Sequence, residues 1–264
     1  MSYEHILYQV EGPIATLTLN RPERLNALTP LMREEIYEAI AQAEESNDVR
    51  AMIITGAGKG FCSGGDVKAM QENIKNRQGN PLDERITPMR DKVVLAMRET
   101  SKPLIAAING AAAGGGLGLA LSCDIRLASN NARMGMTFSR RGLHPDWGGT
   151  YFLPRLVGTA KAAELIWSGR MIEADEALHL GIVSYVTEPD QLMEQARNMA
   201  QQFADSAPVA VRLTKRSIYA NMDSDLREAL ERESSAQTIA ASTKDYREGV
   251  NAFVEKRKPR FTGE

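Results

Sequence analysis

The sequence has few of the residues on which several common classes of protein depend. Its 264 residues include two cysteines, Cys62 and Cys123, too few for a disulfide framework or a zinc-binding set. The formal net charge of -2 offers no general attraction for nucleic acid or a membrane surface. No apolar run approaches the roughly 20 residues of a transmembrane helix, and residues 1–5 do not resemble a secretory leader. We therefore expect a globular protein of the reducing cytoplasm that holds no metal.

Glycine, in contrast, is concentrated at two places where a predicted strand leads into a predicted helix. Gly114, Gly115 and Gly116 follow one apolar run, and the segment 56–66 is a second glycine-rich junction. Glycine permits backbone angles closed to other residues and leaves peptide N–H groups accessible to a ligand. The spacing matches neither the dinucleotide-binding nor the P-loop pattern. The junctions indicate either a site for an oxygen that gains negative charge or close packing of small residues, and the presence of two favours the first.

The periodicity of apolar residues predicts an α/β protein. Strands are expected at 6–10, 14–19, 52–55, 104–108, 124–127, 133–136 and 183–186. Helices are expected after Thr29-Pro30 and over 87–99, 150–157, 160–167, 173–180, 192–204, 207–221, 226–242 and 246–256. The segment 71–85 is predicted to be a helix end followed by a loop, and 138–150 a second loop. Repeated strand-strand-helix units before a helical tail suggest a right-handed spiral of short sheets, or else an ordinary doubly wound sheet.

Four segments, 20–28, 61–66, 108–124 and 142–150, resemble the crotonase (enoyl-CoA hydratase/isomerase) superfamily in order and spacing, as does the stretch 245–261. The resemblance covers essentially the whole chain. It implies a crotonase-like ββα spiral core over residues 1–200 and a helical C-terminal trimerisation domain over residues 201–264. It also implies a homotrimer or dimer of trimers that acts on acyl-CoA thioesters, with coenzyme A as part of the substrate and no further cofactor.

By this resemblance, the backbone N–H groups of Gly65 and Gly115 are the two donors of an oxyanion hole. Reactions of the superfamily pass through a thioester enolate, and one such donor contributes about 3 kcal/mol to stabilising the oxyanion. The resemblance also implies contacts with coenzyme A by three groups of residues: Arg24, Leu25 and Ala27 along its path, Cys62, Ser63, Gly64 and Asp66 at its adenine and pantetheine parts, and Phe253 and Lys256 at its tail. For Lys256 the alternative is a solvated helix face.

The chain departs from the pattern of typical hydratases of this superfamily, which place two glutamates near the thioester. Those positions align with Gly118 and Phe138, and no acidic residue occurs in 106–123 or 125–145. Asp146 is the nearest remaining carboxylate, at the position where isomerases and dehalogenases of the superfamily carry a catalytic aspartate. Its neighbours should desolvate it partly and raise its pKa, which would make it a better base. The alternative is that Asp146 caps a helix beginning at Trp147.

Other candidates for proton transfer or nucleophilic attack have weaker support. His144 is isolated in a loop, and Cys62 has no histidine partner at a recognised spacing. Asp124 is expected to serve structure.

The segment 138–150 resembles the ring-opening epoxyphenylacetyl-CoA isomerases of aerobic phenylacetate degradation. We therefore expect an acyl-CoA isomerase that shifts a double bond or rearranges the ring of an enoyl- or arylacetyl-CoA. The alternatives are an enoyl-CoA hydratase of fatty-acid or aromatic-acid degradation, using Asp146 or an ordered water, and a non-catalytic acyl-CoA-binding scaffold. The sequence does not define the acyl group, because the segment 71–85 is expected to form part of the pocket wall.

Overall fold

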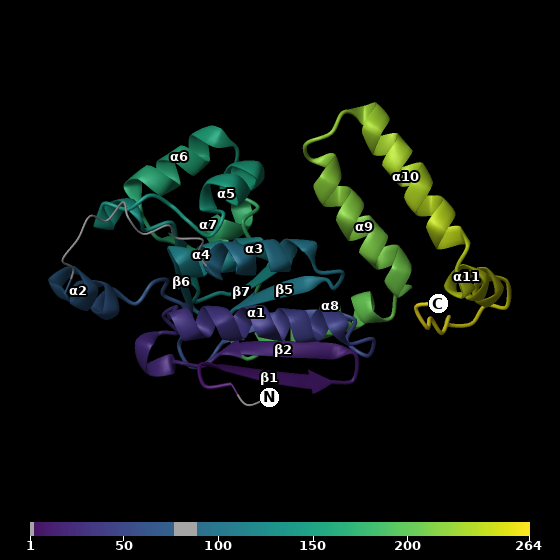
Figure 1. Ribbon diagram of the computed structural model, residues 1–264, viewed down its shortest axis with the longest axis horizontal. Helices are drawn as coiled ribbons and strands as arrows, with labels where there is room; N and C mark the ends of the chain where they lie inside the picture. Colours follow the sequence, from purple (N-terminus) through teal and green to yellow (C-terminus); the bar gives the residue numbers. More distant parts are fainter. Residues whose placement is uncertain (1–2, 77–88) are drawn as a thin grey trace.

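The computed structural model describes residues 3–76 and 89–264, which form two sheets surrounded by helices (Figure 1). The predicted loop after residue 76 lies outside the described residues. The strands of the larger sheet, in spatial order, are β1 (Ile6–Glu11), β2 (Ile14–Leu19), β3 (Ala51–Gly56), β5 (Leu104–Ile108), β7 (Ile125–Ser129) and β10 (Tyr185–Thr187). The smaller sheet contains β4 (Gly60–Cys62), β6 (Ala111–Ala113), β8 (Arg133–Gly135) and β9 (Ile172–Glu173). Neighbouring strands are parallel except in the pairs β1–β2 and β8–β9.

The helices agree closely with those expected from the sequence. They are α1 (Pro30–Glu45), α2 (Val67–Asn76), α3 (Met89–Glu99), α4 (Gly115–Ser122), α5 (Gly149–Val157), α6 (Thr159–Ser168), α7 (Ala174–His179), α8 (Leu192–Ala204), α9 (Pro208–Asn221), α10 (Leu226–Ala241) and α11 (Lys244–Val254). The predicted start of α1 is confirmed, because the Thr29 side chain accepts a hydrogen bond from the Met32 N–H. No helix of the described residues combines the length and apolarity needed to cross a membrane.

Three short strands, β4, β6 and β9, were not expected. Strand β6 lies within the stretch predicted to be a turn between a strand and α4. Its three alanines show no alternation of polar and apolar residues, so the sequence carries no signal for it. Strand β6 pairs with β4 and β8, and this pairing brings the two glycine-rich junctions to the same sheet.

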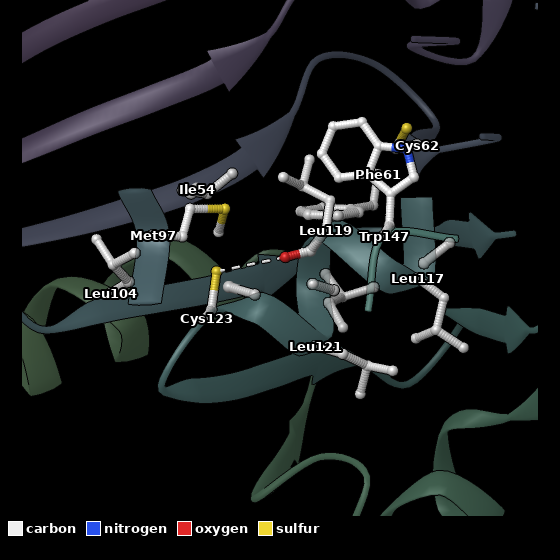
Figure 2. Packing of buried hydrophobic residues seen from close by; sticks show 14 of the residues in the cluster. Ile54, Phe61, Cys62, Met97, Leu104, Leu117, Leu119, Leu121, Cys123 and Trp147 are labelled. Atoms are coloured by element: carbon white, nitrogen blue, oxygen red, sulfur yellow. Dashed lines mark hydrogen bonds between the residues drawn. The ribbon is translucent and has the colours of Figure 1, made fainter. Parts of the chain in front are cut away.

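The inner strands of the larger sheet, β2, β3, β5 and β7, are mostly buried on both faces, as expected for a mainly parallel sheet covered by helices. Successive residues of β3 point to opposite sides: Ile53 packs with α8, whereas Met52 and Ile54 pack with α1, α3 and α4. Figure 2 shows part of the cluster that contains Ile54, around α4. There the Cys123 Sγ–H donates to the Leu119 carbonyl oxygen at 3.8 Å. The boundary predicted at residue 200 falls inside α8, a helix that packs on this sheet.

Helices α9, α10 and α11 stand apart from the sheets (Figure 1). They expose large apolar side chains that no described part of the chain covers: Ile218, Met222, Leu226, Leu230, Ile239, Tyr246, Val250, Phe253 and Val254. Leu226 is 75% exposed and Phe253 is 85% exposed. Large apolar side chains of a surface helix normally pack against the rest of the protein.

A buried polar cluster attaches α9 to the core. The Lys215 ammonium donates to the Asp124 carboxylate at 2.8 Å and to the carbonyl oxygens of Met97 and Lys102 at 3.3 and 2.9 Å. The Tyr219 hydroxyl also donates to Asp124, which confirms that this aspartate has a structural role. Burial lowers the pKa of Lys215, and the Asp124 carboxylate opposes that effect. Three oxygen acceptors, one of them a carboxylate, thus compensate for the burial of the Lys215 ammonium.

Lys215→Met should destabilise the protein by about 3 kcal/mol, because it leaves a buried carboxylate without its cation. The free energy of unfolding from urea titration would measure this. Lys161→Met is the matched control, because Lys161 is 41% exposed and pairs only with Glu164 on the surface of α6. Equal, small effects of the two substitutions would contradict a stabilising role for the cluster.

Candidate active site

The loop 20–28 holds the first glycine-rich junction in place. The buried Asn26 side chain accepts from the Arg21 N–H at 2.8 Å and donates to the carbonyl oxygens of Ala57 and Gly60 at 3.0 and 2.8 Å. Its left-handed backbone, with φ 56°, turns the chain so that the Leu28 N–H donates to the Gly64 carbonyl oxygen at 2.8 Å. The loop and the 62–66 segment are thus joined by both side-chain and backbone hydrogen bonds.

An ion pair reinforces this junction. The Arg21 guanidinium lies 3.4 Å from the Asp66 carboxylate and also donates to the Ala27 carbonyl oxygen at 2.8 Å. Both side chains are mostly buried, at 16% and 15% exposure. Asp66 is therefore tied to the protein itself, which leaves less of its carboxylate for the predicted contact with coenzyme A.

The two glycine-rich segments approach so closely that side chains would not fit between them. A Cβ atom on Gly64, whose φ is +90°, would lie 2.6 Å from the Ala113 carbonyl oxygen and 3.3 Å from the Gly115 nitrogen. A Cβ atom on Gly116 would lie 2.1 Å from the Cys62 carbonyl oxygen. These contacts require glycine, so close packing explains some of the glycines at both junctions.

The remaining glycines present free donors. Gly115 is the first residue of α4, and the first N–H groups of a helix have no partner within it. Across the described residues, neither the Gly115 N–H nor the Gly65 N–H donates to a backbone or side-chain oxygen. The Gly115 nitrogen lies beside Gly64, so the structure brings both predicted oxyanion donors to one place. A helix N-terminus also favours negative charge there.

Trp147 fills the space in front of α4. A Cβ atom on Gly118 would lie 2.4 Å from the Trp147 Cβ, and one on Gly115 would lie 2.9 Å from the Trp147 Cδ1. The indole belongs to the buried cluster around α4, and Figure 2 shows it with Phe61, Leu117 and Leu119. A glutamate at position 118 would therefore require Trp147 to move.

Phe138, the other position that aligns with a hydratase glutamate, is 9% exposed and belongs to the same buried cluster. Its ring lies against Gly114, 3.7 Å from where a Cβ atom of that glycine would be. Apolar packing thus occupies both positions.

Asp146 immediately precedes Trp147 and is not a helix cap. Helix α5 begins at Gly149 with Gly148 as its N-cap, and no side chain caps it. The Asp146 Oδ2 instead lies 3.0 Å from the Arg90 Nη1 at the start of α3. Burial raises the pKa of Asp146 above the usual carboxyl value, whereas the charges of Arg90 and Arg33 lower it and that of Asp91 raises it. The expected direction of the shift is confirmed.

Arg33 and Arg90 were missed in the sequence. They come from α1 and α3, separated from Asp146 by more than 50 residues, and no motif connects them. Charges that act on one another from such distant positions leave no signal in a single sequence.

The other candidates have less support in the structure than Asp146. Burial raises the pKa of the Cys62 thiol to about 12, so it remains protonated and a poor nucleophile. His144 is exposed in the loop before α5. The described residues contain no group of three or more His, Cys, Asp or Glu side chains arranged to hold a metal ion.

Residues 9–264 match the sequence profile of the family described as enoyl-CoA hydratase/isomerase. The chain belongs to this family. It is 41% identical to a short-chain-enoyl-CoA hydratase of Clostridium acetobutylicum, over 98% of this chain and 97% of that protein. It is 38% identical to a 1,2-epoxyphenylacetyl-CoA isomerase of Escherichia coli, over 98% of this chain and 99% of that protein. A crystal structure of an enoyl-CoA hydratase from Bacillus anthracis matches with a TM-score of 0.92 and 36% identity, over 99% of this chain and 100% of that chain. This match confirms the predicted fold.

The residues expected to contact coenzyme A fall into three groups in this family member. Arg24 and Leu25 are exposed, and Ser63, partly exposed, donates from its hydroxyl to the Arg24 carbonyl oxygen at 3.3 Å. These three lie together at the rim of the glycine site.

The two other groups lie away from this rim. Cys62 is fully buried and Ala27 is 5% exposed, so their side chains pack inside the protein instead of facing a ligand. Phe253 lies in α11 and Lys256 follows it, and α11 lies at one edge of the molecule, well separated from β6 and α4 (Figure 1). They do not approach Gly65 and Gly115 of their own chain.

Gly65→Pro should reduce kcat on the order of 10²-fold, because it removes one donor N–H from the oxyanion site. Gly65→Ala is the matched control, because its added methyl meets only the flexible end of Met70, at 2.3 Å, and the N–H remains. Steady-state kinetics with an enoyl-CoA substrate and thermal unfolding of both variants would check this. Equal activity of the two variants would contradict the assignment.

Gly115→Pro should have a similar effect, since proline is tolerated at the first position of a helix but lacks the N–H group. Gly115→Ala is the control, because its added methyl also displaces Trp147 but the N–H group remains.

Proposed function

We propose that the protein is an acyl-CoA isomerase that moves a double bond, or opens and rearranges a ring, through a thioester enolate. The observation that carries this proposal is the packing of Trp147 against Gly115 and Gly118, which fills the position of one hydratase glutamate with the residue that directly follows Asp146. Hydration with two glutamates needs a second carboxylate to position and activate water. Isomerisation needs one group that takes a proton and returns it.

The proposed reaction uses the site in two steps. The thioester carbonyl oxygen accepts hydrogen bonds from the N–H groups of Gly65 and Gly115. Asp146 removes a proton from the α- or γ-carbon, and the C–H electron pair moves into the conjugated system, placing negative charge on that oxygen. The enolate then takes the proton back from Asp146 at the other carbon, which re-forms the thioester carbonyl with the double bond shifted.

The relatives support both this reaction and its main alternative. The E. coli relative is named as an epoxyphenylacetyl-CoA isomerase, whereas the C. acetobutylicum relative is named as a hydratase. Hydration by this chain would use Asp146 or an ordered water. Parallel assays of 3-enoyl-CoA isomerisation and 2-enoyl-CoA hydration separate these two activities. Tight binding of acyl-CoA with neither activity would favour a non-catalytic scaffold.

Asp146→Asn should lower kcat for isomerisation on the order of 10²-fold or more with little change in substrate affinity, because the amide keeps the shape but cannot accept the proton. The variant should also stop exchanging the α- and γ-hydrogens of the substrate with deuterated solvent, as followed by NMR. In the unmodified protein, activity should fall as the pH drops through the raised pKa of Asp146, since only the carboxylate form is a base. Normal isomerisation by Asp146→Asn would exclude this aspartate as the proton carrier.

We further propose that α9–α11 bury their exposed apolar faces against other copies of the chain, in a trimer or a dimer of trimers. The exposure of Leu226, Leu230 and Ile239 supports this, because a monomer would leave them in water. In such an assembly, Phe253 and Lys256 would reach coenzyme A bound to a neighbouring copy. Light scattering should give the mass of three or six chains, and a stable monomer at micromolar concentration would contradict the proposal.

A further inference from the structure

Asp146 belongs to a tight turn that fixes its backbone but not its carboxylate. The Gly149 N–H donates to the Asp146 carbonyl oxygen at 3.0 Å, and the two residues between them have left-handed backbones, with φ 53° at Trp147 and 70° at Gly148. Trp147 is 3% exposed, so the turn is anchored in the core. The last torsion of an aspartate side chain is broad, so neither the turn nor a rotamer preference decides which carboxylate oxygen faces the site.

One cation contacts this carboxylate. The Arg90 Nη1, in the first turn of α3, lies 3.0 Å from the Asp146 Oδ2. Within residues 3–76 and 89–264, no other basic side chain lies within ion-pair distance of Asp146. The two side chains are 28% and 32% exposed, and an ion pair exposed to this extent contributes at most about 1 kcal/mol to stability. Stability alone is therefore a weak reason for the contact.

A second carboxylate fixes the direction of the Arg90 guanidinium. Its Nε donates to the Asp91 Oδ1 at 3.3 Å, whereas its Nη1 faces Asp146. The planar guanidinium presents its donors in a rigid fork, so a contact at one nitrogen limits where the others point. Arg90 therefore meets Asp146 from a defined side, which the flexible ammonium of a lysine would not do.

The two oxygens of the Asp146 carboxylate are consequently different. Oδ2 lies beside the Arg90 cation. In the part of the chain that the structure describes, no side chain and no backbone N–H of another residue donates to Oδ1. Oδ1 therefore has lone pairs that can accept a proton directly, whereas Oδ2 would first have to lose its contact with Arg90.

We propose that Arg90 is a positioning residue for the reaction: by holding Oδ2, it turns Oδ1 of Asp146 toward the substrate as the oxygen that accepts the proton. The inference rests on the proposed role of Asp146 as proton carrier. Three charged groups act on Asp146 from the helices around it, Arg90 and Asp91 on α3 and Arg33 on α1. Burial raises the pKa of Asp146 most, Arg90 and Arg33 lower it, and Asp91 raises it. Loss of Arg90 should thus alter both ionisation and orientation, and the test has to separate them.

A double-mutant cycle with Arg90→Gln and Asp146→Asn separates these effects. Arg90→Gln should move the acid limb of the pH profile to higher pH, because the cation that lowers the pKa of Asp146 is lost. It should also lower kcat for isomerisation on the order of 10-fold at a pH where the carboxylate is fully ionised, with little change in KM, because the base is misaligned. In the Asp146→Asn background the same substitution should have no further effect, since Arg90 acts through Asp146.

Two further variants control for charge and for stability. Arg90→Lys retains the charge without the planar fork, so its acid limb should stay in place while its maximal kcat remains low. Arg133→Gln removes a 57% exposed arginine that pairs with Glu173 at 2.9 Å, and it should leave kcat and the pH profile unchanged. Each variant should unfold at nearly the temperature of the unmodified protein, because these ion pairs are exposed.

The possible failures are distinguishable. Normal maximal kcat in Arg90→Gln or Arg90→Lys, with Asp146→Asn inactive, would overturn the inference and leave the proposed function in place. An equal loss from Arg90→Gln in both backgrounds would also overturn it, because Arg90 would then act independently of Asp146. Normal isomerisation by Asp146→Asn, or none by the unmodified protein, would reject the proposed function and the inference with it.

Discussion

The close approach of two backbone segments, 62–66 and 113–116, is the constraint on which the site depends. At the nearest points a single added methyl would lie 2.1 to 2.6 Å from a carbonyl oxygen of the other segment, so only glycine allows the contact. Strands β4 and β6 bring the segments side by side, and the unpaired N–H of Gly115 at the start of α4 comes to lie beside Gly64. Packing and ligand binding are therefore not competing explanations of these glycines. Some glycines permit the approach, and the approach places the N–H groups of their neighbours together.

The absence of side chains at Gly115 and Gly118 also allows Trp147 to pack against α4 near the donor N–H groups. Because Gly115 and Gly118 have no Cβ atoms, Trp147 packs directly on α4, with a left-handed backbone that few residues other than glycine adopt. This positions Asp146 at the end of the same loop. A glutamate at 118 and a tryptophan in the present position of Trp147 exclude each other, so the absence of the hydratase pair and the prominence of Asp146 have one structural cause.

Much of this arrangement could be predicted from the sequence, but not all of it. Long apolar periodicities predicted α8 to α11 within a few residues, and the glycine runs located the two junctions that the structure brings to one sheet. Strands β4, β6 and β9 could not be predicted, because two or three residues carry no periodicity. The burial of Cys62 and Ala27 was missed because adjacent residues of one motif can face either the core or the ligand. The arginines around Asp146 were missed because nothing local connects them to it.

The environment of Asp146 has to satisfy two opposing requirements. Hydrogen-bond donors such as the two glycine N–H groups stabilise an oxyanion strongly only where water is excluded. Excluding water also raises the pKa of a nearby carboxyl group, which would leave the base protonated at neutral pH. The charges of Arg90 and Arg33 oppose this effect and lower the pKa of Asp146. The Arg90 guanidinium does so from 3.0 Å, beside the Oδ2 oxygen, so the group that keeps the carboxylate ionised also lies at an oxygen that has to accept the proton. The base can act through Oδ2 only if the substrate displaces Arg90, whereas Oδ1 has no such requirement.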